Sequence, residues 1–203
     1  MARLEDHPVP QRLFHGVNLI SFAALAVSGY YIYRPFAPGL MGAMKTIHYF
    51  FMFVISANLV ARVYYAFFGR YRDAGVFAFR GADLKTLGPM VGYYLTLRPR
   101  PRTDRLNPLQ KIAYLAAVGM LVLQAVTGFS LYWPNSVLGA VVRAVGGLHN
   151  LRLIHIALMW IFFAGILIHL YLVLTEAYDD FLLMFFGRLR PPAAAGRRIR
   201  PGA

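Results

Sequence analysis

The sequence predicts an all-α fold, an integral membrane four-helix bundle with both termini in the cytoplasm. Of its 203 residues, 59% are hydrophobic and only 14% are charged, and the mean hydropathy is +0.53, which is too apolar for an ordinary soluble domain of this length. Four long stretches almost free of charge are separated by connections that contain proline, glycine and basic residues. Lys and Arg also concentrate in alternate connections, which indicates a fixed orientation in a membrane.

Each of the four apolar stretches is long enough to cross a bilayer as a helix. The expected spans are residues 13–33, 44–68, 109–133 and 150–176. The third should end near Pro134, because proline cannot continue a helix. The second contains Arg62, which must extend to polar surroundings or find a partner. Residues 82–97 carry apolar side chains at helical spacing, which predicts a short amphipathic helix on the inner membrane surface.

The distribution of basic residues predicts the topology. The connection between the second and third spans and the C-terminal tail are rich in Lys and Arg, whereas the two other connections hold only Arg34 and Lys45, then Arg143 and Arg152. The positive-inside rule therefore places both termini in the cytoplasm and the protein in the inner (cytoplasmic) membrane of the cell. The net charge of +13 is then interpreted as contact with anionic lipid rather than with nucleic acid. We expect residues 1–186 to form one membrane domain and residues 187–203 a basic, disordered tail.

Four of the six histidines fall within the predicted spans and sort into two levels. His15 lies near the inner end of the first span and His48 near the outer end of the second. His155 and His169 are fourteen residues apart on the fourth, so they leave one helix face about 21 Å apart. The levels pair His15 with His169 on the inner side and His48 with His155 on the outer side. Because imidazole is a preferred axial ligand of haem iron, the pattern predicts two bis-histidine haem b sites.

Other uses of the histidines compete with haem ligation. Zinc or copper would require ligands within about one helical turn, often with thiolate or carboxylate help, and no such group is evident. The chain has no cysteine, which excludes an iron–sulfur cluster held by its own thiolates and thioether-attached haem. His149 is about 120° around the helix from His155 and is interpreted as interfacial, and His7 as a solvated residue without a chemical role. A histidine proton relay in a non-redox anchor or transporter stays open.

Two further residues fit the same two levels, and a third occurs in a similar local sequence. Arg62 follows His48 by fourteen residues, at the level of the inner pair, where it could bind a haem propionate or simply extend to the membrane surface. Gly29 is at the outer level, where a flat macrocycle could approach the backbone. Gly128 occurs in a similar local string on the third span, although small residues also serve helix packing. The two strings are Ser28-Gly29-Tyr30 and Thr127-Gly128-Phe129.

Together, several short motifs resemble the b-type cytochrome subunit of membrane-bound nickel–iron hydrogenases, which is similar to the gamma subunit of respiratory formate dehydrogenase. The motifs run in order from about residue 8 to residue 180. They are Arg12-Leu13-Phe14-His15, Ser28-Gly29-Tyr30, Ile47-His48, Arg62-Val63-Tyr64-Tyr65-Ala66-Phe67-Phe68-Gly69, Asn107-Pro108-Leu109-Gln110, Thr127-Gly128-Phe129-Ser130-Leu131-Tyr132 and the stretch from His155 to His169.

The resemblance implies a two-haem electron-transfer subunit of a respiratory oxidoreductase complex without a primary catalytic centre of its own. Electrons would come from an iron–sulfur subunit, docked with a large catalytic subunit on the outer face, and pass to quinone near the inner haem. It also implies that His169 and Asn107 contact the quinone, and Gln110 is a nearby polar candidate from the residues themselves. A stand-alone quinol or ferric reductase of the cytochrome b561 kind is an alternative, and the sequence does not identify the electron donor.

Overall fold

The computed structural model describes residues 8–96, 99, 101–102 and 106–187, and within these ranges its regular secondary structure is entirely helical. Four helices are long and apolar enough to cross a membrane, which confirms the predicted all-α class with four candidate spans. They are α1 (Val9–Tyr33), α2 (Met41–Phe68), α4 (Pro108–Tyr132) and α6 (Leu148–Glu176). The shorter elements are the helical turn η2 (Ala74–Val76) and the helices α3 (Gly81–Thr96), α5 (Gly139–Ala144) and α7 (Tyr178–Phe186).

Glycines in the left-handed region precede two of the long helices, and a proline lies just after the end of a third. Gly39 has a φ of 80° before α2, and Gly146 and Gly147 have φ angles of 82° and 113° before α6, a region that glycine enters at little cost. The helix α4 ends at Tyr132, close to the proline that was expected to stop it. The first, second and fourth helices start a few residues earlier than the predicted spans, because a helix can extend beyond the apolar segment on which those limits were based.

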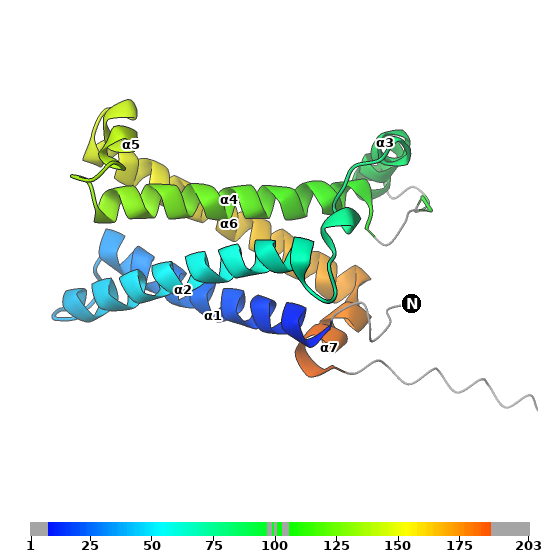
Figure 1. Cartoon of the computed structure of the whole chain (residues 1–203), viewed down its shortest axis with the longest axis horizontal. Coiled ribbons are helices and arrows are strands. Elements are labelled where there is room, and N and C mark those ends of the chain that lie inside the picture. Colours follow the sequence, from blue (N-terminus) through cyan, green and yellow to red (C-terminus); the bar gives the residue numbers. More distant parts are fainter. Residues whose placement is uncertain (1–7, 97–98, 100, 103–105, 188–203) are drawn as a thin grey trace, which may run out of the picture.

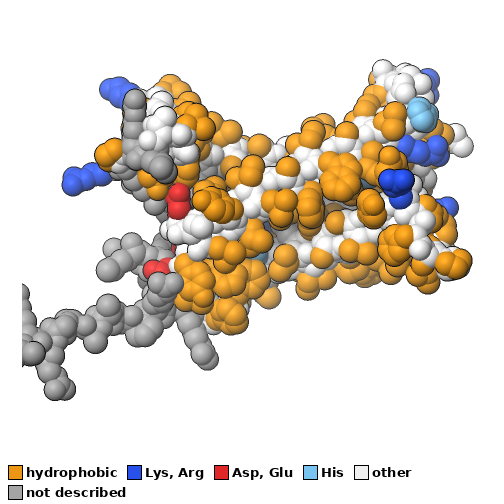
Figure 2. Space-filling view, turned by 180° about the vertical axis from the view of Figure 1, so that it is seen from behind, with side chains coloured by type: hydrophobic (Ala, Val, Ile, Leu, Met, Phe, Trp, Pro, Cys, Tyr) orange, Lys and Arg blue, Asp and Glu red, His pale blue; other side chains and the backbone are white. Residues whose placement is uncertain are grey.

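The four long helices form two antiparallel hairpins that lie against each other (Figure 1). The helices α1 and α2 pack closely along their length, and α4 packs most closely on α6. One end of the bundle carries α3, α7 and the beginning of α1, and the other end carries α5 (Figure 1). Figure 2 shows apolar side chains over the middle of the molecule and basic side chains towards its two ends. The exposed apolar surface of the long helices, for example Val60 and Ile168, is therefore suited to contact lipid.

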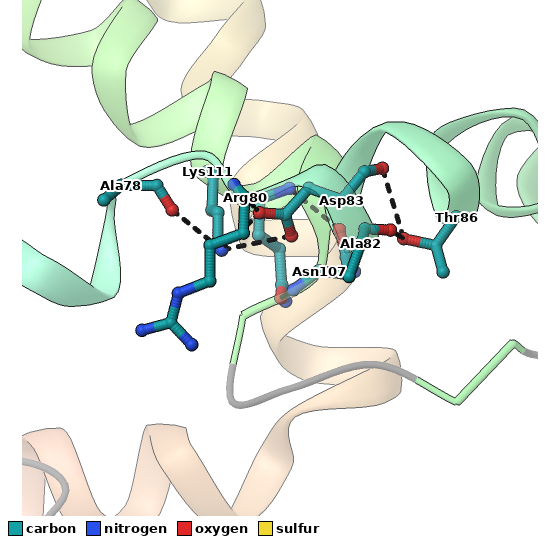
Figure 3. A network of polar contacts seen from close by, with 8 residues as sticks. Ala78, Arg80, Ala82, Asp83, Thr86, Asn107 and Lys111 are labelled. Atoms are coloured by element: carbon teal, nitrogen blue, oxygen red, sulfur yellow. Dashed lines mark hydrogen bonds and ion pairs between the residues drawn. The ribbon is translucent and has the colours of Figure 1, made fainter.

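Polar contacts hold the short helices α3 and α7 to the long helices at one end of the bundle. At the α3 end, Asp83 of α3 forms a buried ion pair with Lys111 of α4, with 2.8 Å between carboxylate Oδ2 and Nζ (Figure 3). Lys111 Nζ also donates to the carbonyl of Ala78. The helix α7 is attached to α1, because Arg12 Nε donates to the carbonyl oxygen of Met184 at 3.0 Å. The amphipathic helix predicted at 82–97 is confirmed as a helix, whereas α5 and α7 were not predicted.

Two of the sequence-based expectations fall outside the described residues. They concern His7 and the basic tail from residue 188 onwards.

Candidate functional site

The structure brings His48 of α2 together with His155 of α6. Their ring centroids are 6.3 Å apart and their ring planes differ by 76°. An imidazole nitrogen binds a metal ion at about 2.0–2.1 Å, and the nitrogen is about 1.2 Å from the ring centre, so two imidazoles on opposite sides of one iron would have centroids about 6.4 Å apart. The separation of the two rings is close to this value and is therefore compatible with both imidazoles binding one iron. In the part of the chain that the structure describes, no three His, Asp or Glu side chains gather as a metal site.

Each of these imidazoles contacts a hydroxyl group on the other helix of its own hairpin. Ser28 Oγ of α1 lies 3.0 Å from His48 Nδ1. Thr127 Oγ1 of α4 lies 2.7 Å from His155 Nδ1. Both hydroxyl residues are buried. Sequence reasoning did not assign them a role, although the similarity of the strings around Gly29 and Gly128 was the signal that could have found them.

The glycine after each hydroxyl residue leaves room for the imidazole. A Cβ atom at Gly29 would lie 3.0 Å from His48 Cε1, which is too close for an ordinary contact. A Cβ at Gly128 would lie 3.4 Å from His155 Cε1 and 3.6 Å from the sulfur of Met52. Gly29 was expected to let a macrocycle approach the backbone. In the structure, the group that a side chain at this position would meet is the histidine ring itself.

His15 and His169, which were expected to pair at the inner level, have other neighbours in the structure. The His15 ring is 5.7 Å from the ring of Phe185 in α7, with the planes perpendicular. His15 also lines a cavity of about 280 Å³ between α1 and α7, together with Arg12, Met184 and other residues. The side chain of His169 is exposed on α6. The short helix α7, which the sequence did not predict, is therefore a neighbour of His15.

Arg62 has a carboxylate partner within the chain. Its guanidinium binds Asp73 through both nitrogens, at 3.1 Å from NH1 and 2.6 Å from NH2. Gln11 Nε2 of α1 donates to the same carboxylate at 2.8 Å. The positive charge that was expected to face a haem propionate is thus already paired with Asp73, which follows α2 in the connection to α3.

Asn107 and Gln110 cap the beginning of α4. Asn107 Oδ1 accepts from the backbone nitrogen of Gln110 at 2.8 Å, and Gln110 Oε1 accepts from the backbone nitrogen of Asn107 at 3.0 Å. This reciprocal arrangement is a capping box. Asn107 is 1% exposed, and its Nδ2 has no hydrogen-bond partner among the described residues. The Asn107 side chain thus caps α4, and its Nδ2 is a buried donor that makes no hydrogen bond with the described residues.

The buried ion pair lies one turn beyond this cap (Figure 3). Lys111 Nζ donates to both carboxylate oxygens of Asp83, and the backbone nitrogen of Arg80 donates to Oδ2. The hydrogen bonds from Lys111 are the main reason why the pKa of Asp83 is lower than its ordinary value. The pair fastens α3 across the end of α4, next to Asn107.

Comparison with known proteins gives a consistent match over most of the chain. The family model described as prokaryotic cytochrome b561 matches residues 6–187. A probable Ni/Fe-hydrogenase B-type cytochrome subunit of Azotobacter vinelandii is 31% identical over 192 residues, covering 84% of this chain and 80% of the relative. Relatives with corresponding names from Cupriavidus necator and Escherichia coli K12 are 27% and 28% identical, and each covers more than three quarters of both chains.

Proposed function

Because the chain belongs to the prokaryotic cytochrome b561 family, we propose that it is the membrane-embedded b-type cytochrome subunit of a nickel–iron hydrogenase complex. The observation that carries the proposal is the separation of 6.3 Å between the rings of His48 and His155, on helices from different hairpins. The relatives are hydrogenase cytochrome subunits by name, which supports hydrogenase over formate dehydrogenase as the partner enzyme.

We propose two haem b sites, one at each end of the bundle. His48 and His155 would hold the outer haem, with Gly29 and Gly128 leaving space for their rings. His15 and His169 would hold the inner haem, supported by the distance of fourteen residues between His155 and His169 on one helix face. Arg62, at the inner level, would face a propionate. Haem iron bound in this way would supply one-electron transfer across the apolar core.

The partners follow from the topology that we propose. Both termini, α3 and α7 would be cytoplasmic, and α5 would face outward, where an iron–sulfur subunit and its large catalytic subunit would dock. Quinone would react at the inner end, close to His169, Asn107 and Gln110. The buried Nδ2 of Asn107, which lacks a partner among the described residues, supports this choice because it could donate to a quinone oxygen.

Optical spectroscopy of the purified protein tests the haem proposal. We expect a bis-histidine b-type reduced-minus-oxidised spectrum and about two haems per chain by extraction. His155→Ala should remove the outer haem while leaving the inner one, and His149→Ala is the matched control because it changes an exposed histidine on the same helix. A haem content near zero in the wild-type protein, expressed with an adequate haem supply, would refute the proposal.

Co-purification separates the hydrogenase role from its main alternative. A cytochrome b561-type quinol or ferric reductase would act without a docked partner, whereas the proposed subunit should bring an iron–sulfur protein with it from native membranes. The proton-relay alternative predicts a colourless preparation instead.

A further inference from the structure

We propose that Ser28 and Thr127 are positioning residues that fix the tautomer of His48 and His155 and thereby lower the reduction potential of the outer haem. This inference rests on the proposed function, because it concerns how the same pair of histidines would bind iron. It adds two residues outside the ligand set and a direction for their effect.

The hydrogen-bond directions follow from the number of hydrogens available. Ser28 Oγ donates to the carbonyl of Ala24 at 2.6 Å, and Thr127 Oγ1 donates to the carbonyl of Leu123 at 2.8 Å. A hydroxyl has one hydrogen, so each oxygen can only accept in its second contact, which is with a histidine Nδ1. Each Nδ1 must therefore carry the hydrogen. Nε2 of both rings is then left with its lone pair, as metal ligation requires.

The same hydrogen bonds should affect the iron as well as the ring. A ligand imidazole that donates through its second nitrogen becomes a stronger base, which stabilises the ferric state more than the ferrous state. Both histidines that would hold the outer haem would have this property, because the hydroxyl–imidazole contact occurs once in each hairpin. The two hydrogen bonds should therefore lower the reduction potential in the same direction, and their combined effect should be larger than that of either one alone.

Ser130 shows what a hydroxyl does in this bundle when it has only a structural role. Its Oγ donates to the carbonyl of Val126 at 2.7 Å, as helical serines in apolar surroundings often do. It is completely buried and lies on α4, one turn beyond Thr127. Ser130→Ala therefore removes a helical hydroxyl of the same kind while leaving both hydroxyl–histidine contacts in place, and it serves as the matched control.

Redox titration of the purified haem protein tests the inference. Ser28→Ala and Thr127→Val should each raise the midpoint potential of the outer haem, so that its reduced-to-oxidised ratio at a fixed ambient potential increases severalfold. A tenfold increase corresponds to about 59 mV for one electron. Ser28→Thr and Thr127→Ser keep the hydroxyl and should restore the wild-type potential, and Ser130→Ala should leave it unchanged.

Loss of the outer haem in Ser28→Ala, with retention in Ser28→Thr and Ser130→Ala, would also support positioning by the hydroxyl. Retained haem with an unchanged potential in both Ser28→Ala and Thr127→Val would overturn the inference, and so would an equal shift in Ser130→Ala. These results differ from those expected if the proposed function is wrong, because in that case the wild-type protein itself would contain no haem.

Discussion

Gly29 of α1 leaves the space into which the imidazole of His48 packs from α2. A Cβ at this position would approach His48 Cε1 to 3.0 Å, whereas the preceding residue, Ser28, contacts Nδ1 of the same ring. The two consecutive residues thus place one histidine: the hydroxyl group sets which way the ring is turned, and the missing side chain sets how closely it approaches the helix.

Gly29→Ala should displace the His48 ring and reduce the haem content of the outer site. The added methyl requires a shift of a few tenths of an ångström, and a metal ligand tolerates little misplacement. The measurement is haem per chain, with the inner haem as internal reference. Gly165→Ala is the control, because a Cβ at Gly165 meets nothing within 4 Å. Equal haem content in both variants would contradict the prediction.

The ion pair between Asp83 and Lys111 should make stability depend on acid pH. The folded-state pKa of Asp83 is lower than that of the unfolded chain, so its contribution is complete above the unfolded value of about 4 and is lost as the pH falls through the folded value. Asp83→Asn should lower the thermal unfolding temperature in detergent at pH 7, and the difference from wild type should shrink below about pH 4. Lys85→Ala on the exposed face of α3 is the control. A difference that is independent of pH would contradict the prediction.

Substitutions at Asn107 can separate its capping role from quinone binding. Asn107→Ala should cost about 1 kcal/mol of stability, because α4 loses its cap. Asn107→Ser keeps an oxygen that can cap the helix but removes Nδ2, so it should recover most of the stability and still impair quinone reduction. Thermal unfolding and a quinone-reduction assay with the partner enzyme are the two measurements. Full activity in Asn107→Ser would exclude Nδ2 from the quinone site.

Substitutions of Arg62 and of Asp73 should have different effects if Arg62 also binds a haem propionate. Their ion pair is partly exposed, with side-chain exposures of 24% and 13%, so Asp73→Asn should cost only about 0.5–1 kcal/mol. Arg62→Gln should cost a similar amount and, if Arg62 faces a propionate, should also lower the potential of the inner haem, since a nearby cation favours the reduced state. Redox titration of both variants tests this. Identical potentials would assign Arg62 to the ion pair alone.

The membrane helices could be predicted because charge-free segments of this length have few alternatives. The pairing of His48 with His155 could be predicted as well, because helix rise and alternating direction fix the level of each residue. Helix rise and direction do not determine how each helix is rotated about its own axis relative to its neighbours. The contacts of Ser28 and Thr127 with the histidines depend on this rotation, and they are therefore seen only in the structure.

The end of the bundle that carries α3 and α7 was harder to predict because loops and short helices contribute to it. Asp73 lies in a connection, so nothing in the sequence linked it with Arg62, eleven residues earlier. The helix α7 and its contact with His15 were not predicted, because residues 178–186 are too few to form a further span and carry two aspartates near their start. By contrast, Asn107 and Gln110 have the spacing of a capping box, so that role could have been read from the sequence.

The location of Ser28 and Thr127 bears on how the protein is made. Each hydroxyl contacts the histidine of its own hairpin. If the hydroxyls position the histidines as we propose, each histidine would be oriented once its two consecutive spans have inserted, without contacts from the other hairpin. The prosthetic group would then be the last component to arrive and would join two halves that are already prepared to receive it.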